Sequence, residues 1–301
     1  MAITAADVNK LRQQTGAGMM DCKNALVEAN GDFETAIDIL RKKGQKIAAK
    51  RGGNDAKEGL IMAQATADSK AGVILTLNCE TDFVAKNDGY VAFVQSLVDL
   101  ALNKLPETAE ELKALAYDDR LSVEDKITEQ VGVIGEKLDL SAYAVVRAEN
   151  VVAYNHPGNQ LATLVGLTVA GEDVAEAGRQ VAMQVAAMAP IAIDKHGVNE
   201  RTIEREIEVG KELAIQEGKP ADMAEKIAMG RLNKFFQENT LLSQQFVRDN
   251  KLTVEQFLNT TEKGLTVTDF RRFSLRSFIC KLWYEMSDLI QTSCNGLNTC
   301  E

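Results

Sequence analysis

The side chains that could take part in catalysis are few and far apart in this sequence. The chain contains two histidines, His156 and His196, and neither lies at the HxxxH spacing used by zinc enzymes. Cys79, Asp82 and His156 could be combined into a cysteine nucleophile with a base. A buried strand cysteine and a turn histidine are the simpler interpretation. The residues therefore favour a binding or regulatory protein over an enzyme, and they indicate neither a cofactor nor a metal.

A carboxylate, an aromatic and a cation follow one another closely in the stretch LNCETDFVAKND, residues 77–88. The stretch comes directly after an apolar strand pattern and before a helical one. Asp82 is placed to cap the coming helix. An aromatic at a strand-to-helix turn usually packs into the core of its own domain, and this is the interpretation favoured for Phe83. The alternative is that Phe83 is an exposed wedge aimed at another molecule.

The stretch TGAGMMDCK, residues 15–23, has a faint likeness to a phosphate-binding loop. It lacks the GxxxxGKS/T register, and it lies between helical patterns rather than after a strand. Its glycines are more simply explained by a tight turn between two helices. Met19 and Met20 are then either core residues, which the spacing favours, or an adaptable contact surface.

The composition is that of an acidic globular chain. Its 301 residues are 45% hydrophobic and carry a net charge of −10, with a pI near 5.0. Direct binding of nucleic acid is disfavoured, because such proteins present a basic face or an aromatic stacking platform. No apolar run is long enough to span a membrane, and the N-terminus resembles neither a signal peptide nor a transit peptide. We therefore expect a cytoplasmic protein.

The N-terminal residues 1–44 are predicted to form three short helices. Thr4 is a good N-cap for the first helix, and Asp32 is a good N-cap for the third. Because a glycine often follows the last turn of a helix, we expect the third helix to end at Gly44. The basic stretch 45–59 is then predicted to be a linker, with a helical start as the alternative.

Two α+β halves are predicted to follow, at residues 60–141 and 142–275. Each half contains paired strand patterns followed by an amphipathic helix, which indicates a weak internal duplication. A last strand pattern, LTVTDFRRFSL, should return to the second sheet. The predicted fold class is therefore α+β.

A helical hairpin is predicted at about residues 199–238, where two long helical patterns meet at Gly218 and Pro220. The hairpin is also a candidate surface for self-association. The tail at residues 276–301 holds the single tryptophan and three of the five cysteines, and no role is assigned to it. An apolar seam should hold the two helices of the hairpin together, formed by Ile203, Ile207, Ala214, Met223 and Ile227.

Several stretches, taken in order, resemble a known family. TGAGMMDCKNAL and NCETDFVAKND are similar to the elongation factor Ts family. The resemblance continues to about residue 275 through VIGEKLDL, GKPADMAEKIAMGRLNKFF, FVRDNKLTVEQFL and DFRRF. It implies an α+β fold that begins with a three-helix module like the ubiquitin-associated fold. It further implies a core of two α+β subdomains with antiparallel sheets, and a helical hairpin that projects from the second subdomain.

The resemblance also implies a partner, elongation factor Tu, whose GDP the family helps to release. It implies that a short segment enters the GTPase domain of this partner near the bound magnesium: Thr81, Asp82, Phe83 and Val84. Further contacts are implied to the same domain and to a second surface of the partner, from Arg12, Met19, Met20, Lys23, Ile134, Gly135, His156 and Val247. Phe83 is then the exposed wedge, contrary to the expectation for an aromatic at a strand-to-helix turn.

The implied activity is an exchange of ligands, in which this chain makes and breaks no bond. Disturbing the magnesium site would weaken the hold on GDP, and the factor would stay bound until GTP enters. The resemblance places this activity in the bacterial cytoplasm. The alternative is a ubiquitin-associated-type adaptor that binds protein partners without driving exchange.

Overall fold

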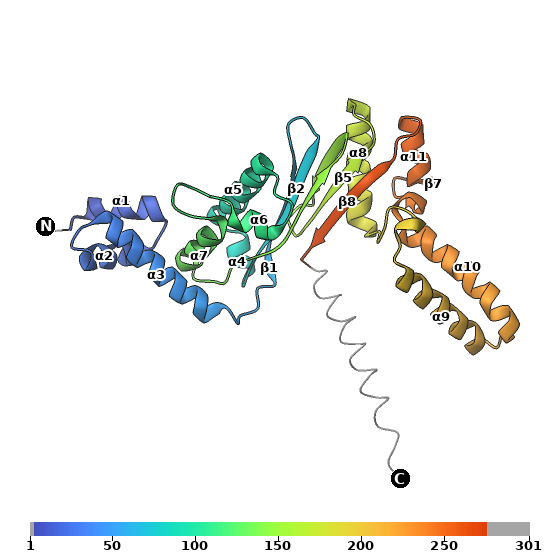
Figure 1. Cartoon of the computed structure of the whole chain (residues 1–301), viewed down its shortest axis with the longest axis horizontal. Helices are drawn as coiled ribbons and strands as arrows, with labels where there is room; N and C mark the ends of the chain where they lie inside the picture. Colours follow the sequence, from blue (N-terminus) through green and yellow to red (C-terminus); the bar gives the residue numbers. More distant parts are fainter. Residues whose placement is uncertain (1–2, 276–301) are drawn as a thin grey trace, which may run out of the picture. The chain divides into compact units, whose positions relative to one another are not determined.

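The computed structural model describes residues 3–275, so the tail predicted at 276–301 lies outside the described residues. The fold is α+β, as predicted, with helices and small sheets alternating along the chain (Figure 1). One sheet has the strand order β1 (Glu58–Ala65), β2 (Ala71–Cys79), β3 (Asp139–Arg147). A second sheet has the order β4 (Asn150–Asn155), β5 (Leu161–Leu167), β8 (Val267–Ser274), and β6 (Gln245–Phe246) pairs with β7 (Asp249–Thr253). The described residues divide into two compact units, one with residues 3–62, 75–144 and 273–275, and one with residues 63–74 and 145–272.

The three predicted N-terminal helices are present. The side chain of Thr4 accepts a hydrogen bond from the backbone N–H of Asp7, and the Asp7 carboxylate accepts one from Thr4 N–H in return. Asp32 caps the third helix through Thr35 N–H. Their small core contains Val8, Leu11, Cys22, Leu26 and Ala36. The three helices are α1 (Ala5–Thr15), α2 (Met19–Glu28) and α3 (Phe33–Arg51).

The third helix does not end at Gly44, and this prediction is wrong. Helix α3 continues to Arg51, so the segment predicted as a linker at 45–59 begins as helix. Gly44 is buried, and a Cβ added there would lie 3.4 Å from the carbonyl oxygen of Thr128 in α7 (Val123–Ile134). The glycine therefore allows two helices to approach closely and does not serve as a helix stop.

The strand hairpin predicted after the linker is present, and its second strand is buried along its whole length. Tyr90 OH donates a 2.7 Å hydrogen bond to the Leu77 carbonyl, which ties α5 to β2. Strand β3 is a neighbour of β2, so the division predicted at residue 142 falls inside a strand of this sheet. The elements are β1 (Glu58–Ala65), β2 (Ala71–Cys79), α4 (Asp82–Ala85), α5 (Asp88–Lys104), α6 (Ala109–Ala114), α7 and β3 (Asp139–Arg147).

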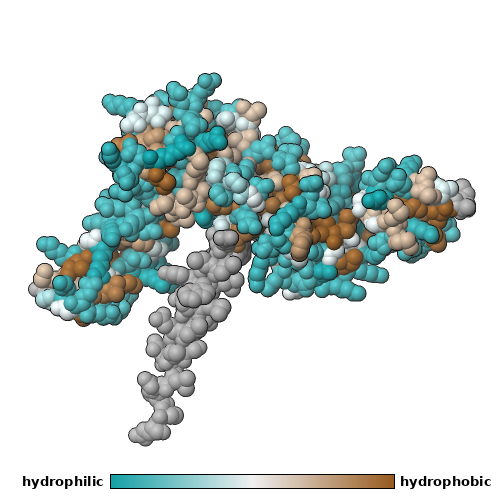
Figure 2. Space-filling view, turned by 180° about the vertical axis from the view of Figure 1, so that it is seen from behind, coloured by the Kyte–Doolittle hydropathy of each residue, from teal (hydrophilic) through white to brown (hydrophobic). Residues whose placement is uncertain are grey.

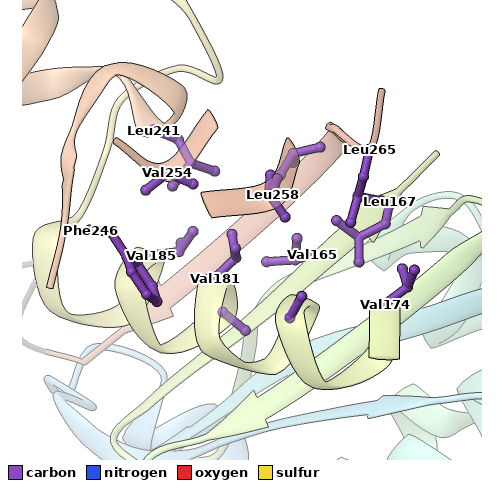
Figure 3. Packing of buried hydrophobic residues seen from close by; sticks show 13 residues of the cluster. Val165, Leu167, Val174, Val181, Val185, Leu241, Phe246, Val254, Leu258 and Leu265 are labelled. Carbon is purple, nitrogen blue, oxygen red and sulfur yellow. The ribbon is translucent and has the colours of Figure 1, made fainter. Parts of the chain in front are cut away.

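The second sheet is covered by a long helix. Strands β4 (Asn150–Asn155) and β5 (Leu161–Leu167) are antiparallel, with Val152 opposite Val165. The valines of α8 (Glu172–Met188) point toward the side chains of β5 and α11 (Val254–Thr261) in one apolar cluster (Figure 3). Strand β8 (Val267–Ser274) lies next to β5, as predicted for the last strand.

The predicted internal duplication has a structural counterpart in the two helices that follow the strand pairs. Helices α5 and α8 each contain 17 residues. Each ends at a residue other than glycine in the left-handed conformation, Leu105 with φ 46° and Ala189 with φ 45°. The same order of two strands and a long helix thus occurs twice.

The predicted helical hairpin consists of α9 (Glu200–Gln216) and α10 (Ala221–Asn239). The helices approach closely at Gly210, where an added Cβ would lie 3.2 Å from the Cα of Ala228. In the predicted seam, Ala214 is buried, but Met223 is exposed, so Met223 was wrongly assigned to it. The remaining elements are the 3₁₀ turns at Lys195–Gly197 and Leu241–Ser243, and the short strands β6 (Gln245–Phe246) and β7 (Asp249–Thr253).

Candidate functional site

The exposed aromatic ring of Phe83 is the most prominent feature of the site. Phe83 lies on the four-residue helix α4, directly after β2, and it is 82% exposed. The same helix turns Ala85 inward, where it is buried. The expectation that this aromatic at a strand-to-helix turn packs into its own core is therefore wrong, because the single turn of α4 directs Ala85 inward instead of Phe83.

The N-cap of the helix that carries Phe83 lies one residue earlier in the chain than the sequence predicts. Thr81 occupies the N-cap of α4, so the expectation that Asp82 caps this helix is wrong. Asp82 is the first helical residue, and its carboxylate is 2.6 Å from Lys86 Nζ one turn later. The hydrogen bond from Lys86 holds the pKa of Asp82 below its ordinary value. Val84 is half-buried beside them.

Two glutamates fix the backbone at the start of this turn. Glu136 accepts hydrogen bonds from the N–H groups of Glu80 and Thr81 and from the Thr81 hydroxyl. Glu80 accepts two hydrogen bonds from Arg51 at the end of α3 and one from Lys137 N–H. The hydrogen bond from Lys137 is the main reason that the pKa of Glu80 lies below its ordinary value. The turn is therefore anchored on charged groups while Phe83 itself stays exposed.

The contact residues predicted on the N-terminal helices are at the surface. Met19 and Met20 are 56% and 63% exposed in the first turn of α2, so the spacing argument that favoured a core position is wrong for both. Arg12 and Lys23 are also exposed. The glycine-containing segment before α2 is an inter-helical turn, as predicted, with Gly16 in the left-handed conformation. Figure 2 shows hydrophobic side chains at the surface of these helices, at the right of the view.

Ile134 and Gly135 lie at the C-terminal end of α7. Gly135 is the C-cap in the left-handed conformation, with φ 81°, and its N–H donates to the Val131 carbonyl. Both residues are half-buried, and they directly precede the glutamate that holds the Phe83 turn. The structure thus brings two sequence-predicted contact segments, at 81–84 and at 134–135, together through Glu136.

His156 and Val247, which are distant in sequence, line one groove of about 470 Å³ in the second unit. Val247 is 59% exposed, and the Nδ1 of His156 is 3.0 Å from the hydroxyl of Tyr154. The groove also includes Met183 and Phe246, which the sequence reasoning did not single out as site residues. Apolar periodicity identifies residues that face away from solvent, but it cannot show which of them border a groove.

Cys79 lacks the properties of a nucleophile. Its thiol is buried and donates a hydrogen bond to the Thr81 carbonyl, and burial raises its pKa to about 11. A cysteine nucleophile needs a lowered pKa, because the thiolate is the reactive form. Within residues 3–275, acidic, histidine and cysteine side chains do not gather in a group of three that could hold a metal ion. Over the same residues, no helix is long and apolar enough to cross a membrane.

The fold and these surfaces define an α+β protein that presents an anchored aromatic side chain, exposed methionines and an apolar groove. Side chains of this kind at a surface are typical of protein–protein interaction sites. A family model described as "Elongation factor TS" matches residues 80–277.

Relatives named "Elongation factor Ts" match nearly the whole chain. The one from Amoebophilus asiaticus is 57% identical over 273 residues, which cover 90% of this chain and 98% of the relative. The one from Christiangramia forsetii is 50% identical, over 91% of this chain and 98% of the relative. The one from Porphyromonas gingivalis is 46% identical, over 92% of this chain and 100% of the relative. The chain belongs to the elongation factor Ts family, a family of translation factors.

Proposed function

We propose that this chain binds elongation factor Tu in its GDP form and promotes release of the GDP, without catalysing a chemical reaction. The observation that supports this proposal is the exposure of Phe83 on a turn that is fixed by hydrogen bonds. An apolar ring held out in water carries a cost in free energy, and contact with a partner removes that cost. The activity places the chain in the cytoplasm, where translation takes place.

The proposed mechanism is a coupling of two binding equilibria. If this chain binds the nucleotide-free partner more tightly than the GDP form, it weakens GDP binding by the same factor. Phe83 and its neighbours Thr81, Asp82 and Val84 would enter the GTPase domain near its magnesium, which helps to hold the phosphates. GTP then binds the nucleotide-free partner. By the same coupling it weakens the binding of this chain, which dissociates.

Two further surfaces would hold the partner while the wedge acts. Exposed side chains of the N-terminal helices would contact the GTPase domain, namely Arg12, Met19, Met20 and Lys23. Methionine suits such a surface, because its unbranched side chain adapts to its partner. Ile134 and Gly135 would extend the same contact beside the wedge. His156 and Val247 would bind a second surface of the partner along their groove.

The direct test is the rate at which labelled GDP leaves elongation factor Tu with and without this protein. We expect the rate to rise with the concentration of the protein and to saturate. Removal of magnesium by a chelator gives the reference for a fully disturbed metal site. A complex that forms without faster release would contradict the proposal and indicate an adaptor instead.

Self-association through the helical hairpin is a separate proposal. Apolar side chains are exposed on both of its helices, among them Val209 and Leu213 on α9 and Met229 on α10. Analytical ultracentrifugation across a concentration series tests it, and a monomer at every concentration would contradict it.

A further inference from the structure

The turn that carries Phe83 depends on a residue that is far from it in sequence. Glu136 Oε2 lies 3.0 Å from Thr81 N and 3.2 Å from Glu80 N, and Glu136 Oε1 lies 2.7 Å from the Thr81 hydroxyl. One carboxylate thus accepts hydrogen bonds from three donors at the base of α4. Hydrogen bonds to a charged acceptor are stronger than those between neutral groups.

The contact is reciprocal. The Glu80 carboxylate lies 2.6 Å from Lys137 N, so each of the two segments places a glutamate on the backbone N–H groups of the other. Glu80 is also held by Arg51, at 2.8 and 2.9 Å from its two carboxylate oxygens. The segment 80–81 is thereby fixed to the end of α7 and to the end of α3.

Helix α4 has little stability of its own. It contains four residues, and helices of that length are not stable in isolation. Thr81 is its N-cap, but the Thr81 side chain makes no capping hydrogen bond to the helix. The hydroxyl donates to Glu136 instead. The orientation of Phe83 therefore depends on contacts from outside the helix.

We propose that Glu136 is a positioning residue for the partner-binding function, which it serves by holding the Phe83 turn in its binding geometry before the partner arrives. The inference rests on the proposed function and deepens it. A side chain that is already ordered loses less entropy on binding than one that must be ordered by the partner. Glu136 also joins the Phe83 turn to Ile134 and Gly135, so the two predicted contact segments would meet the partner as one surface.

Three variants and a control test the proposal. Glu136→Ala removes all three hydrogen bonds. Glu136→Gln keeps the shape, and its amide oxygen can still accept from the backbone, so it serves as the conservative rescue. Thr81→Val removes only the hydroxyl donor, and it tests the positioning role if Glu136→Ala does not fold. Asp139→Asn is the matched control, because it removes one negative charge at a nearby exposed position in β3.

The measurements are GDP release from elongation factor Tu at saturating protein, the half-saturating concentration, and amide hydrogen exchange at Glu80 and Thr81. We expect Glu136→Ala to lower the rate of GDP release at saturation roughly 10- to 100-fold, because a small displacement of a contact group can cost that much in rate. The half-saturating concentration should change less, because the other surfaces still bind the partner. Amide exchange at both positions should become faster. Glu136→Gln should retain most of the rate, Thr81→Val should lie between the parent and Glu136→Ala, and Asp139→Asn should match the parent.

The results that would contradict the proposed function differ from those that would contradict the positioning role alone. If the parent protein does not accelerate GDP release, the proposed function is wrong, and the positioning role of Glu136 is wrong as well. If the parent accelerates release and Glu136→Ala equals the parent, only the positioning role is wrong. The role is also wrong if Glu136→Gln is as slow as Glu136→Ala while amide exchange at Glu80 and Thr81 stays at the parent's rate, because the turn would then be held and the charge would act in another way. For a folded Thr81→Val variant, amide exchange and release rates equal to those of the parent would likewise contradict it.

Discussion

Gly132 in α7 lies against Gly44 in α3, so closely that a Cβ added at Gly132 would be 2.6 Å from the Gly44 Cα. Real Cβ atoms do not come that close to a backbone carbon, so any larger residue must push the helices apart. The pair therefore fixes the distance between the last N-terminal helix and α7, whose end carries Ile134, Gly135 and the anchor of the Phe83 turn.

Gly132→Ala is predicted to lower the stability of the protein. Overpacking costs about 1–3 kcal/mol, while alanine in a helix is favoured over glycine by only about 1 kcal/mol. Gly230→Ala in α10 is the matched control, because an added Cβ there would meet nothing within 4 Å. Thermal unfolding should show a lower Tm for Gly132→Ala and an equal or higher Tm for Gly230→Ala. A higher Tm for both would contradict the close approach.

Glu80 is predicted to make the stability depend on acidic pH. Its pKa in the folded protein is below the ordinary 4.5, so the folded state favours the charged carboxylate. The resulting stabilisation is fully present above pH 4.5 and is lost as the pH falls through the folded pKa. Denaturant unfolding at pH 7 should show the parent more stable than Glu80→Gln, by about 1 kcal/mol. This difference should shrink below pH 4.5. A difference that stays constant from pH 7 to pH 3 would contradict the assignment.

Cys79 is predicted to resist alkylation in the folded protein. At neutral pH nearly all of a thiol with a pKa of about 11 is protonated, and Cys79 is also buried. Mass spectrometry after treatment with iodoacetamide should find the Cys79 peptide unmodified in native protein and modified in urea. Native modification of Cys79 with loss of GDP release would instead support a role for its thiol.

Met19 and Met20 are predicted to contribute to binding and not to folding. Replacing both by alanine should weaken the complex with elongation factor Tu by roughly tenfold, about 1.4 kcal/mol, and leave Tm nearly unchanged. Met188→Ala is the control, because Met188 is 47% exposed and has no proposed contact. Calorimetric titration gives the affinities. An unchanged affinity with a much lower Tm would show that the two methionines stabilise the fold and do not contribute to binding.

Local sequence signals predicted the elements that depend on neighbouring residues. The caps at Thr4 and Asp32 and the strand hairpin before Phe83 could be identified because each is defined within a few residues. Gly44 was misjudged because the partner that requires a glycine there, Gly132, is far away in the sequence. A local pattern cannot distinguish a glycine that ends a helix from one that allows another helix to approach.

The site was predictable only in part. The position of Phe83 at a strand-to-helix turn favoured a buried ring, and only the family resemblance placed the ring at the surface, where the structure has it. Nothing in the sequence indicates that Glu136 anchors the turn, although VIGEKLDL and TDFVAK both lie in stretches that resemble the family. Their hydrogen bonds connect residues 55 positions apart, and no sequence pattern reports such a pairing.

The most direct test of the account is Phe83→Ala, measured for activity and for stability. Truncation of an aromatic anchor at an interface costs about 2–4 kcal/mol, so affinity for nucleotide-free elongation factor Tu should fall roughly 30- to 1,000-fold and GDP release should slow. Because Phe83 is exposed, Tm should stay within a few degrees of the parent. Phe93→Ala is the control for a buried ring and should lose about 3–5 kcal/mol of stability. A large fall in Tm for Phe83→Ala, with GDP release intact in the folded fraction, would contradict the proposal that Phe83 is an exposed wedge that enters the partner.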